Sequence, residues 1–273
     1  MIVHNFNPIL VDLGLFQIRW YSMAYILGII LGWIYAKKII KKTAKNKYNF
    51  TSITTSQFDD IIVYLVLGII LGGRLGYVMF YNFGYYSQNI LEIFKLWQGG
   101  MSFHGGLLGV LFSSFLLSKQ WGFKFFEVMD FIAPYVPIGL GSVRIGNFLN
   151  SELLGRPTEV PWGVIFPSDA LGLVRHASQL YQAVGEGIVL LLFMLWYSKK
   201  PRPNLAVSSM FLIGYGVVRC FTEAFREPDA HIGFDLFGLI SRGQVLSIPM
   251  IAIGLVLLFY SYRNMVKKDE TIS

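Results

Sequence analysis

Four basic side chains lie within or at the edge of strongly apolar stretches of this 273-residue sequence. Arg74, Arg144 and Arg219 interrupt hydrophobic runs, and His104 opens the segment HGGLLG. An arginine at mid-membrane costs about 2.5 to 3.5 kcal/mol on insertion scales, so it needs a partner or a function. Guanidinium groups bind phosphate oxygens through paired hydrogen bonds, and histidine exchanges a proton near neutral pH. These residue types therefore point to anion binding with proton transfer.

Residues 142–167 form a long polar interruption that reads SVRIGNFLNSELLGRPTEVPWGVIFP. Arg144 and Asn147 are three residues apart and share a helical face, where the guanidinium can hold phosphate oxygens while the amide orients a hydroxyl. The following loop contains Glu152 and Gly155, and loops of this length are usually functional. The alternative is that Arg144 reaches the headgroup level of a membrane and Asn147 caps a helix.

A second polar face ends a later apolar run, in the segment GYGVVRCFTEAFREPD. Arg219, Glu223 and Arg226 are four and three residues apart, and Tyr215 lies one turn before Arg219. A structural ladder of ion pairs is one interpretation of Glu223. However, one glutamate cannot neutralise two arginines, and the surplus charge favours a bound anion.

His104 is followed by Gly105 and Gly106, which allow a ligand or another backbone to approach closely. The ring can accept a proton or donate to a phosphate oxygen. The alternative is a hydrogen-bonded histidine at a helix end, with glycines that serve helix packing. Both interpretations stay open.

Two other residues are weaker candidates. Arg74, in GGRLGYV, either holds lipid headgroups or pairs with an acid such as Glu152 or Asp130. Tyr21 precedes Tyr25 by four residues at the depth of a membrane interface, where belts of aromatic residues are common. Tyr21 therefore enters the candidate site only provisionally.

The remaining reactive side chains favour structural roles. Cys220 is the single cysteine, which excludes an internal disulfide and a cysteine-based zinc site. We interpret it as a small apolar filler. His176 lies at the entry to an apolar run, which favours capping or loop anchoring over catalysis. The four histidines are scattered and no acidic cluster has ligand spacing, so we expect no metal and no cofactor.

Composition predicts the elements that must position these residues. Apolar residues make up 54% of the chain, only 14% are charged, and the mean hydropathy is +0.54. Soluble proteins carry about 25% charged residues, so we predict an all-α integral membrane protein. Seven runs are long enough to suggest transmembrane helices. They cover residues 20–36, 58–80, 102–118, 126–146, 178–197, 205–223 and 244–262. We expect a single polytopic domain over residues 1–273.

The positions of the basic residues along the chain explain the net charge of +7. Lysine-rich clusters follow the first, third, fifth and seventh runs, so one side of the membrane carries most of the basic residues. The excess of basic residues on cytoplasmic loops then places the amino terminus outside and residues 263–273 in the cytoplasm. Residues 1–19 and 147–177 become outer-side segments. Nucleic-acid binding is not needed to explain the charge, and a removable signal peptide is not expected because no early basic residue precedes an apolar core.

With this orientation the three membrane arginines and His104 all fall near the outer leaflet. Arg74 lies about 24 Å from the inner end of its run at 1.5 Å per residue, and Arg219 about 22 Å. Arg144 is near the outer end of its run, and His104 opens a run that descends from the outer side. This level is cationic and is suited to the phosphate of an anionic lipid.

Taken in order, the motifs resemble the prolipoprotein diacylglyceryl transferase family. The resemblance rests on HGGLLG, RIGNFLNSELLGRPT with PWGVIFP, RHASQLY, RPNLAVSSMFLIGYGVVR with EAFREPD, and SIPM. It covers residues 20–250. The chain departs from the family pattern at Ala177, Gln182 and Cys220, where proline, glutamate and an aromatic residue are common. None of these is a residue with an expected catalytic role.

The resemblance implies an enzyme that moves the diacylglyceryl group of phosphatidylglycerol onto the lipobox cysteine thiol of a prolipoprotein signal peptide. A thioether forms and glycerol phosphate leaves, which is the first step of bacterial lipoprotein maturation. The site would face the outer leaflet of the bacterial cytoplasmic (inner) membrane. The sequence leaves the oligomeric state, the lipid entry route and the preferred prolipoproteins open.

The resemblance also allows roles to be assigned as hypotheses. Arg144 and Arg219 would clamp the phosphate, with Asn147, Glu152 and Gly155 shaping the headgroup pocket. His104 would be the general base for the incoming thiol. A transporter is less consistent, because we see no internal inverted repeat and the basic residues crowd one leaflet. A seven-helix receptor is also less consistent, because the inner loops are short and mostly lysine.

Overall fold

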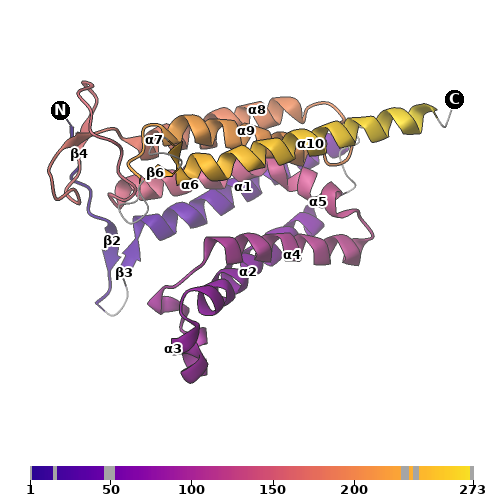
Figure 1. The fold of residues 1–273 in the computed structure, drawn as a ribbon. Helices are drawn as coiled ribbons and strands as arrows, with labels where there is room; N and C mark the ends of the chain where they lie inside the picture. Colours follow the sequence, from indigo (N-terminus) through magenta and orange to yellow (C-terminus); the bar gives the residue numbers. More distant parts are fainter. Residues whose placement is uncertain (1, 15–16, 46–52, 229–233, 236–239, 271–273) are drawn as a thin grey trace. The chain divides into compact units, whose positions relative to one another are not determined.

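The computed structural model describes every residue except 1, 15–16, 46–52, 229–233, 236–239 and 271–273. It contains two compact units (Figure 1). Residues 1–36 and 130–273 form the first, and residues 37–129 form the second.

The first unit is a helix bundle that carries most of the candidate residues. Its helical elements are α1 (Trp20–Lys45) as far as residue 36, α5 (Phe125–Ile132) from residue 130, η3 (Ala133–Tyr135), α6 (Val136–Leu149), α7 (Ser178–Gln182), η4 (Ala183–Val189), α8 (Leu190–Tyr197), α9 (Ala206–Glu223) and α10 (Arg242–Glu270). The segments α7, η4 and α8 run on without a break, and η4 is a π-helix. The long flanks of α9 and α10 lie side by side (Figure 1). Rare π-helical turns often occur at functional sites.

Small residues set the spacing between these helices. A Cβ at Gly141 of α6 would lie 2.9 Å from the Cα of Gly187 in η4, so the two backbones touch. A Cβ at Gly28 of α1 would lie 2.9 Å from the Cβ of Ser142. Within a membrane, close packing of small residues is a main source of helix association. These contacts set the distance between the helices, and so the positions of the polar residues beside them.

A half-buried aspartate, Asp130, caps the start of α9. The backbone N–H groups of Leu205 and Ser208 donate to the Asp130 carboxylate at 2.6 and 2.7 Å, and the Ser208 hydroxyl donates to it as well. A carboxylate at a helix start satisfies free N–H groups and favours the positive end of the helix dipole. Asp130 therefore has a structural role, and its bonds anchor the helix that carries Arg219.

Short strands outside the bundle complete the first unit. β1 (Ile2–Val3) pairs in parallel with β4 (Val164–Ile165), which pairs antiparallel with β5 (Val174–Arg175). The other two pairs are antiparallel: β2 (Ile9–Asp12) with β3 (Gln17–Arg19), and β6 (Phe234–Asp235) with β7 (Ile240–Ser241). The expected outer loop at 147–177 is thus partly a small sheet.

The three-stranded sheet covers an aromatic cluster. His4 is buried against Phe6, Phe148 and Phe166, with ring centroids 5.0 to 5.4 Å away. Its Nδ1 shares a 3.0 Å hydrogen bond with the hydroxyl of Ser151. The amino-terminal segment is therefore fastened to the turn that follows α6.

The second unit is a helix pair with a short appendage. It contains α2 (Thr55–Phe80), α3 (Phe83–Gln88), η1 (Ile90–Phe94), η2 (Leu96–Gln98) and α4 (Phe103–Trp121). Along the contact between α2 and α4, glycine faces glycine, and a Cβ at Gly109 would lie 1.9 Å from the carbonyl oxygen of Gly68. Thr54 and Gln57 form a capping box at the start of α2.

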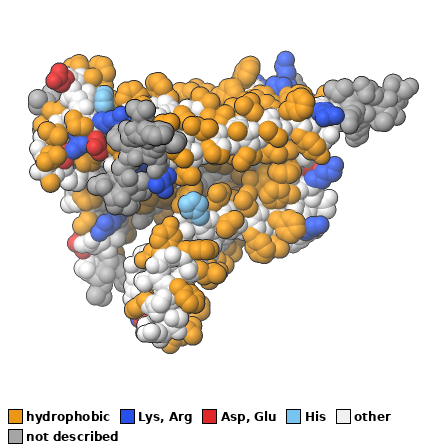
Figure 2. All heavy atoms as spheres, in the orientation of Figure 1, with side chains coloured by type: hydrophobic (Ala, Val, Ile, Leu, Met, Phe, Trp, Pro, Cys, Tyr) orange, Lys and Arg blue, Asp and Glu red, His pale blue; other side chains and the backbone are white. Residues whose placement is uncertain are grey.

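The seven apolar runs all coincide with helices. Among the described residues, five helical segments are long and apolar enough to cross a membrane: Trp20–Lys41, Thr55–Phe80, Phe125–Leu149, Ser178–Tyr197 and Arg242–Met265. The helices α4 and α9 are not among these five. Hydrophobic side chains cover much of the visible helical surface (Figure 2), as expected where lipid is the neighbour. A helical, multi-pass membrane protein is therefore the fold, while seven spans and the orientation of the termini stay predictions.

Candidate functional site

A single buried glutamate joins two of the predicted arginines. The Nε of Arg144, on α6, lies 2.9 Å from Oε2 of Glu186, and the Nη1 of Arg219, on α9, lies 3.1 Å from Oε1. Glu186 belongs to η4 and its side chain is fully buried. Because Gly141 and Gly187 bring α6 and η4 into backbone contact, Arg144 and Glu186 lie within ion-pair distance.

The cluster continues along α9. Nη2 of Arg219 lies 2.6 Å from Oε2 of Glu223, and Nη1 of Arg226 lies 3.4 Å from Oε1 of the same carboxylate. Three arginines thus share the carboxylates of Glu186 and Glu223, which leaves one formal positive charge on this group of five side chains. The sequence analysis weighed Arg219 and Arg226 against Glu223 alone, and the structure adds Glu186 as a second carboxylate beside Arg219.

A second group of polar side chains surrounds the turn after α6. Nδ2 of Asn147 donates to Oε2 of Glu152 at 3.2 Å, and Nδ2 of Asn150 donates to Oε1 at 3.1 Å. The backbone of the turn is strained, because Ser151 and Leu153 both have a φ of 54°. Such strain persists only where surrounding contacts hold the backbone in place.

Those contacts come from three directions. Gln179 donates through Nε2 to the carbonyl oxygen of Glu152, and the Ser178 hydroxyl donates to that of Leu153 at 3.1 Å. His4 and the hydroxyl of Ser168 hold Ser151 from the other side. The Glu152 carboxylate is thereby held on the same unit as the arginine cluster.

Gly155 is required by a backbone contact. A Cβ at this position would lie 2.1 Å from the carbonyl oxygen of His176. Gly155 also forms a β-bridge with Arg226, and its carbonyl accepts from Nη1 of Arg175 at 3.1 Å. Gly155 therefore joins the loop of residues 147–177 to Arg226, at the end of the row of ion pairs on α9. Any effect of Gly155 on a ligand would come from the position of its backbone.

Two tyrosines flank the cluster from other helices. The hydroxyl of Tyr215, one turn before Arg219, hydrogen bonds to the Arg144 side chain. Tyr21 shares a 3.2 Å hydrogen bond with Tyr25 and packs on Gly146, where a Cβ would lie 3.2 Å from the Tyr21 Cα. Tyr215 thus contacts the cluster directly, whereas Tyr21 packs beside it.

Arg74 lies in the second unit and has a different environment. Its Nε donates to the carbonyl oxygen of Ile93 at 2.8 Å, and its two terminal nitrogens donate to four other carbonyls. Those carbonyls belong to Glu92, Lys95, Gly99 and Gly100. The guanidinium also lies 5.1 Å from the ring centroid of Tyr86. All five N–H donors of Arg74 are in use, which favours a structural role over headgroup binding or pairing with Glu152 or Asp130.

His104 also belongs to the second unit, in the first turn of α4. Its ring is exposed and meets Phe103 edge to face at 5.6 Å. Within the described part of residues 37–129, no hydrogen bond to the ring is present. A Cβ at Gly105 would lie 2.2 Å from the carbonyl oxygen of Gly72, so this glycine serves helix packing. His104 itself is left available for chemistry.

The outer loop contains a further arginine that is not in the cluster. Arg175 donates to both carboxylate oxygens of Asp169 at 2.7 and 3.0 Å. These hydrogen bonds, with help from backbone N–H groups, lower the pKa of Asp169 to about 2. Burial lowers the pKa of His176, whose Nδ1 lies 3.2 Å from the hydroxyl of Tyr181. His176 also packs on Phe225, in agreement with loop anchoring.

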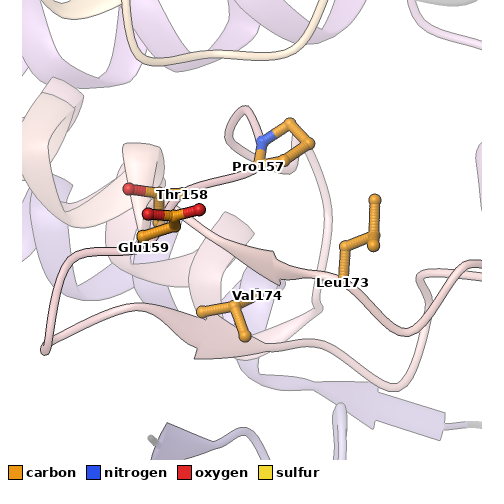
Figure 3. Close-up of a pocket in the computed structure, with 5 residues that line it drawn as sticks. All are labelled: Pro157, Thr158, Glu159, Leu173 and Val174. Carbon is orange, nitrogen blue, oxygen red and sulfur yellow. The ribbon is translucent and has the colours of Figure 1, made fainter.

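The same loop carries a shallow pocket of about 310 Å³ (Figure 3). It is lined by Pro157, Thr158, Glu159, Leu173 and Val174. These residues contribute one carboxylate and no cation. The pocket therefore lacks the positive charge that an anionic ligand needs. No group of three or more His, Cys, Asp or Glu that could hold a metal ion occurs within the described residues.

The sequence analysis missed Glu186 and its neighbours. Gln179, Gln182 and Glu186 are all fully buried, and each lies three or four residues from the next. This spacing puts them on one face of the helical segment α7–η4. A row of polar residues at helical spacing within an apolar run was therefore the available signal.

A bundle of apolar helices around a buried, cationic polar cluster defines a multi-pass membrane protein with an internal polar site. The model of the prolipoprotein diacylglyceryl transferase family matches residues 8–260. The chain belongs to this family.

Three relatives share the name phosphatidylglycerol–prolipoprotein diacylglyceryl transferase. The protein from Teredinibacter turnerae is 50% identical over 248 residues, which cover 91% of this chain and 84% of the relative. That from Oleidesulfovibrio alaskensis is 49% identical over 259 residues, or 95% and 94% of the two chains. That from Nitrosospira multiformis is 50% identical over 266 residues, or 97% and 90%.

Proposed function

We propose that the protein transfers the diacylglyceryl group of phosphatidylglycerol to the lipobox cysteine thiol of a prolipoprotein signal peptide. The observation that carries this proposal is the bridge from Arg144 through Glu186 to Arg219, deep in an apolar bundle. Family membership and relatives of about 50% identity support it. A phosphodiester is negatively charged, which suits a site where Glu186 holds the guanidiniums of Arg144 and Arg219 close together.

The reaction exchanges one bond to carbon for another. The cysteine sulfur attacks the glycerol C3 of the diacylglyceryl group and forms a thioether. The C3–O bond breaks, its electron pair stays on the phosphate oxygen, and glycerol phosphate leaves. The thiol proton must be removed, because the thiolate is the nucleophile.

In this proposal Arg144 and Arg219 stabilise the charge that grows on the leaving phosphate. Glu186 holds both guanidiniums in place before the lipid arrives, so little reorganisation is needed during the reaction. Glu223 and Arg226 extend this support along α9. A water-poor site strengthens these interactions, because the local dielectric is low.

Asn147 and Glu152 shape the headgroup pocket, with Gly155 fixing the loop behind them. Asn147 is buried and its Oδ1 has no hydrogen-bond partner among the described residues, which leaves an acceptor for a ligand hydroxyl. The hydroxyl of Tyr215 adds a donor beside Arg144. Tyr21 is proposed to contact the bound lipid at the edge of this pocket.

His104 is proposed as the general base for the thiol. Its exposed position at the first turn of α4 supports this role, because a base must reach a substrate from another chain. Replacing it by glutamine should remove the base-dependent limb of the pH–rate profile. An unchanged profile in His104→Gln would remove the assignment.

The proposed setting is the bacterial cytoplasmic (inner) membrane, with seven spans and the site at the outer leaflet. The amino terminus would be outside and the carboxyl terminus in the cytoplasm. This orientation follows from the lysine clusters after alternate apolar runs. It brings the site to the side where exported prolipoproteins emerge.

The direct test uses purified protein, phosphatidylglycerol vesicles and a lipobox peptide. We expect the peptide to gain the mass of one diacylglycerol unit, and a peptide with serine in place of cysteine to gain none. Release of glycerol phosphate should match the peptide product in amount. Absence of the mass gain with the wild-type protein would refute the proposed function.

A further inference from the structure

Gln182 lies in the interior of the site with no partner for its side chain. It is the last residue of α7 and its exposed fraction is 0%. Neither Oε1 nor Nε2 hydrogen bonds to any described residue. Buried polar groups in native proteins are nearly always paired, so an amide with both ends unpaired needs an explanation.

The position of Gln182 connects the two halves of the site. Glu186, which bridges the arginines, follows it by four residues on the same helical face. Gln179, three residues before it, donates to the carbonyl oxygen of Glu152. Helix α7 packs against both α6 and α9, which carry Asn147 and Arg219. Gln182 therefore lies between the guanidiniums and the Glu152 turn.

The neighbouring polar side chains of α7, unlike Gln182, do have hydrogen-bond partners within the protein. The Ser178 hydroxyl donates to Leu153, and Gln179 donates to Glu152. The Oδ1 of Asn147, on the helix packed against α7, is also unpaired and buried. The unpaired atoms of Gln182 and Asn147 thus offer one donor group and two acceptors beside the cationic cluster.

We propose that Gln182 binds a hydroxyl of the glycerol headgroup of the lipid substrate, an inference that rests on the proposed function. A hydroxyl both donates and accepts, so it satisfies the carbonyl and the NH₂ of one amide together. The amide is neutral, so the charge of the phosphate is bound by the arginines and not by Gln182. An ammonium headgroup has donors only, so it would leave the Gln182 NH₂ unpaired. Gln182 is therefore a specificity-determining residue for a polyhydroxyl headgroup.

The test compares two lipids with the same phosphodiester. Phosphatidylglycerol carries two headgroup hydroxyls, and phosphatidylpropanol carries none. We expect the wild-type protein to prefer phosphatidylglycerol by about tenfold or more in kcat/KM, since a site that pairs with a hydroxyl rejects an analogue that lacks it. In Gln182→Met, which keeps the side-chain length, the preference should fall to about twofold or less, through a raised KM for phosphatidylglycerol.

A second variant and a control keep the test informative. Gln182→Glu retains an acceptor for the hydroxyl, so it should keep most of the preference, whether or not Gln182→Met folds well. Ser114→Ala removes another fully buried, unpaired hydroxyl, on α4, and should leave the preference unchanged. Equal losses on both lipids in Gln182→Met, or an unchanged preference, would overturn the proposal. A wild-type protein inactive with phosphatidylglycerol would instead refute the proposed function.

Discussion

Two arginine environments, one in each compact unit, differ in their acceptors: Arg74 is buried, whereas Arg144 and Arg219 are half-buried. Around Arg74 the acceptors are five backbone carbonyls from the segment that follows α3. Around Arg144 and Arg219 the acceptors include the shared carboxylate of Glu186. In the first site every donor is used to hold a loop. In the second the arginines outnumber the carboxylates.

The comparison shows that burial of an arginine does not by itself indicate function. Arg74 and Arg144 look alike in the sequence, because each follows small residues within an apolar run. They differ in how many guanidinium donors are already in use and in whether the acceptors are charged. A guanidinium saturated by neutral carbonyls stabilises the fold, whereas guanidiniums held by a shared carboxylate are the ones proposed to bind the anion.

The largest effect is expected when a guanidinium is removed from the site of Arg144 and Arg219. We expect Arg144→Ala or Arg219→Ala to lower the rate of transfer by about 100- to 1000-fold or more, because a preorganised donor to the leaving group is lost. Arg144→Lys should rescue little, since lysine lacks the planar fork. Product mass measured against time would show the loss. Wild-type activity in either alanine variant, with normal membrane insertion, would disprove the phosphate clamp.

Glu186→Gln tests whether the shared carboxylate organises the cluster. Two guanidiniums would then face each other without their common counter-charge. Breaking a buried ion pair in this way costs about 3–5 kcal/mol, so we expect a lower unfolding temperature in detergent together with reduced transfer. Glu159→Gln, on the outer-loop pocket, is the matched control and should change neither quantity. A fully stable, fully active Glu186→Gln protein would show that the arginines are positioned by other contacts.

Arg74→Ala should give the opposite pattern. Loss of the donors leaves carbonyls between Glu92 and Gly100 unpaired, and we expect the free energy of unfolding to fall by roughly 3 kcal/mol. The activity of each folded molecule should stay within about threefold of the wild type. Thermal unfolding and transfer assays on the same preparation would separate the two effects. A large loss of activity without a loss of stability would move Arg74 into the substrate site.

Arg175 provides the smallest effect, and it tests a third arrangement, an ion pair in the sheet outside the helix bundle. Its partner Asp169 has its pKa lowered from 3.8 to about 2 by hydrogen bonds from Arg175. Because the folded-state pKa is the lower one, the pair stabilises the fold above about pH 4 and loses this effect between about pH 4 and 2. Unfolding temperatures of the wild type and Asp169→Asn should differ at pH 6 and converge near pH 2. A difference that persists at pH 2 would contradict this assignment.

Local spacing was enough to predict much of the site. All seven apolar runs are helical, and Arg219 and Arg226 meet Glu223 as the three- and four-residue spacing predicts. The pairing of Asn147 with Glu152 follows a turn of only five residues. These contacts form within one helix or its immediate continuation, so the spacing of residues along the sequence can indicate them.

The rest depends on contacts between distant segments. Glu186 lies 42 residues from Arg144, and only the packing of Gly141 on Gly187 brings them together. The carbonyls around Arg74 come from a loop whose path no periodicity predicts.

The parallel pairing of β1 with β4 also determines the order in which the protein can be completed. Val3 meets Ile165, and His4 reaches Ser151, so the first residues find their partners only after more than half of the chain has been synthesised. The contacts of Ser178 and Gln179 with the turn that carries Glu152 form later still, because these residues follow it in the chain. During synthesis the amino-terminal strand therefore remains without its partner until β4 has been made.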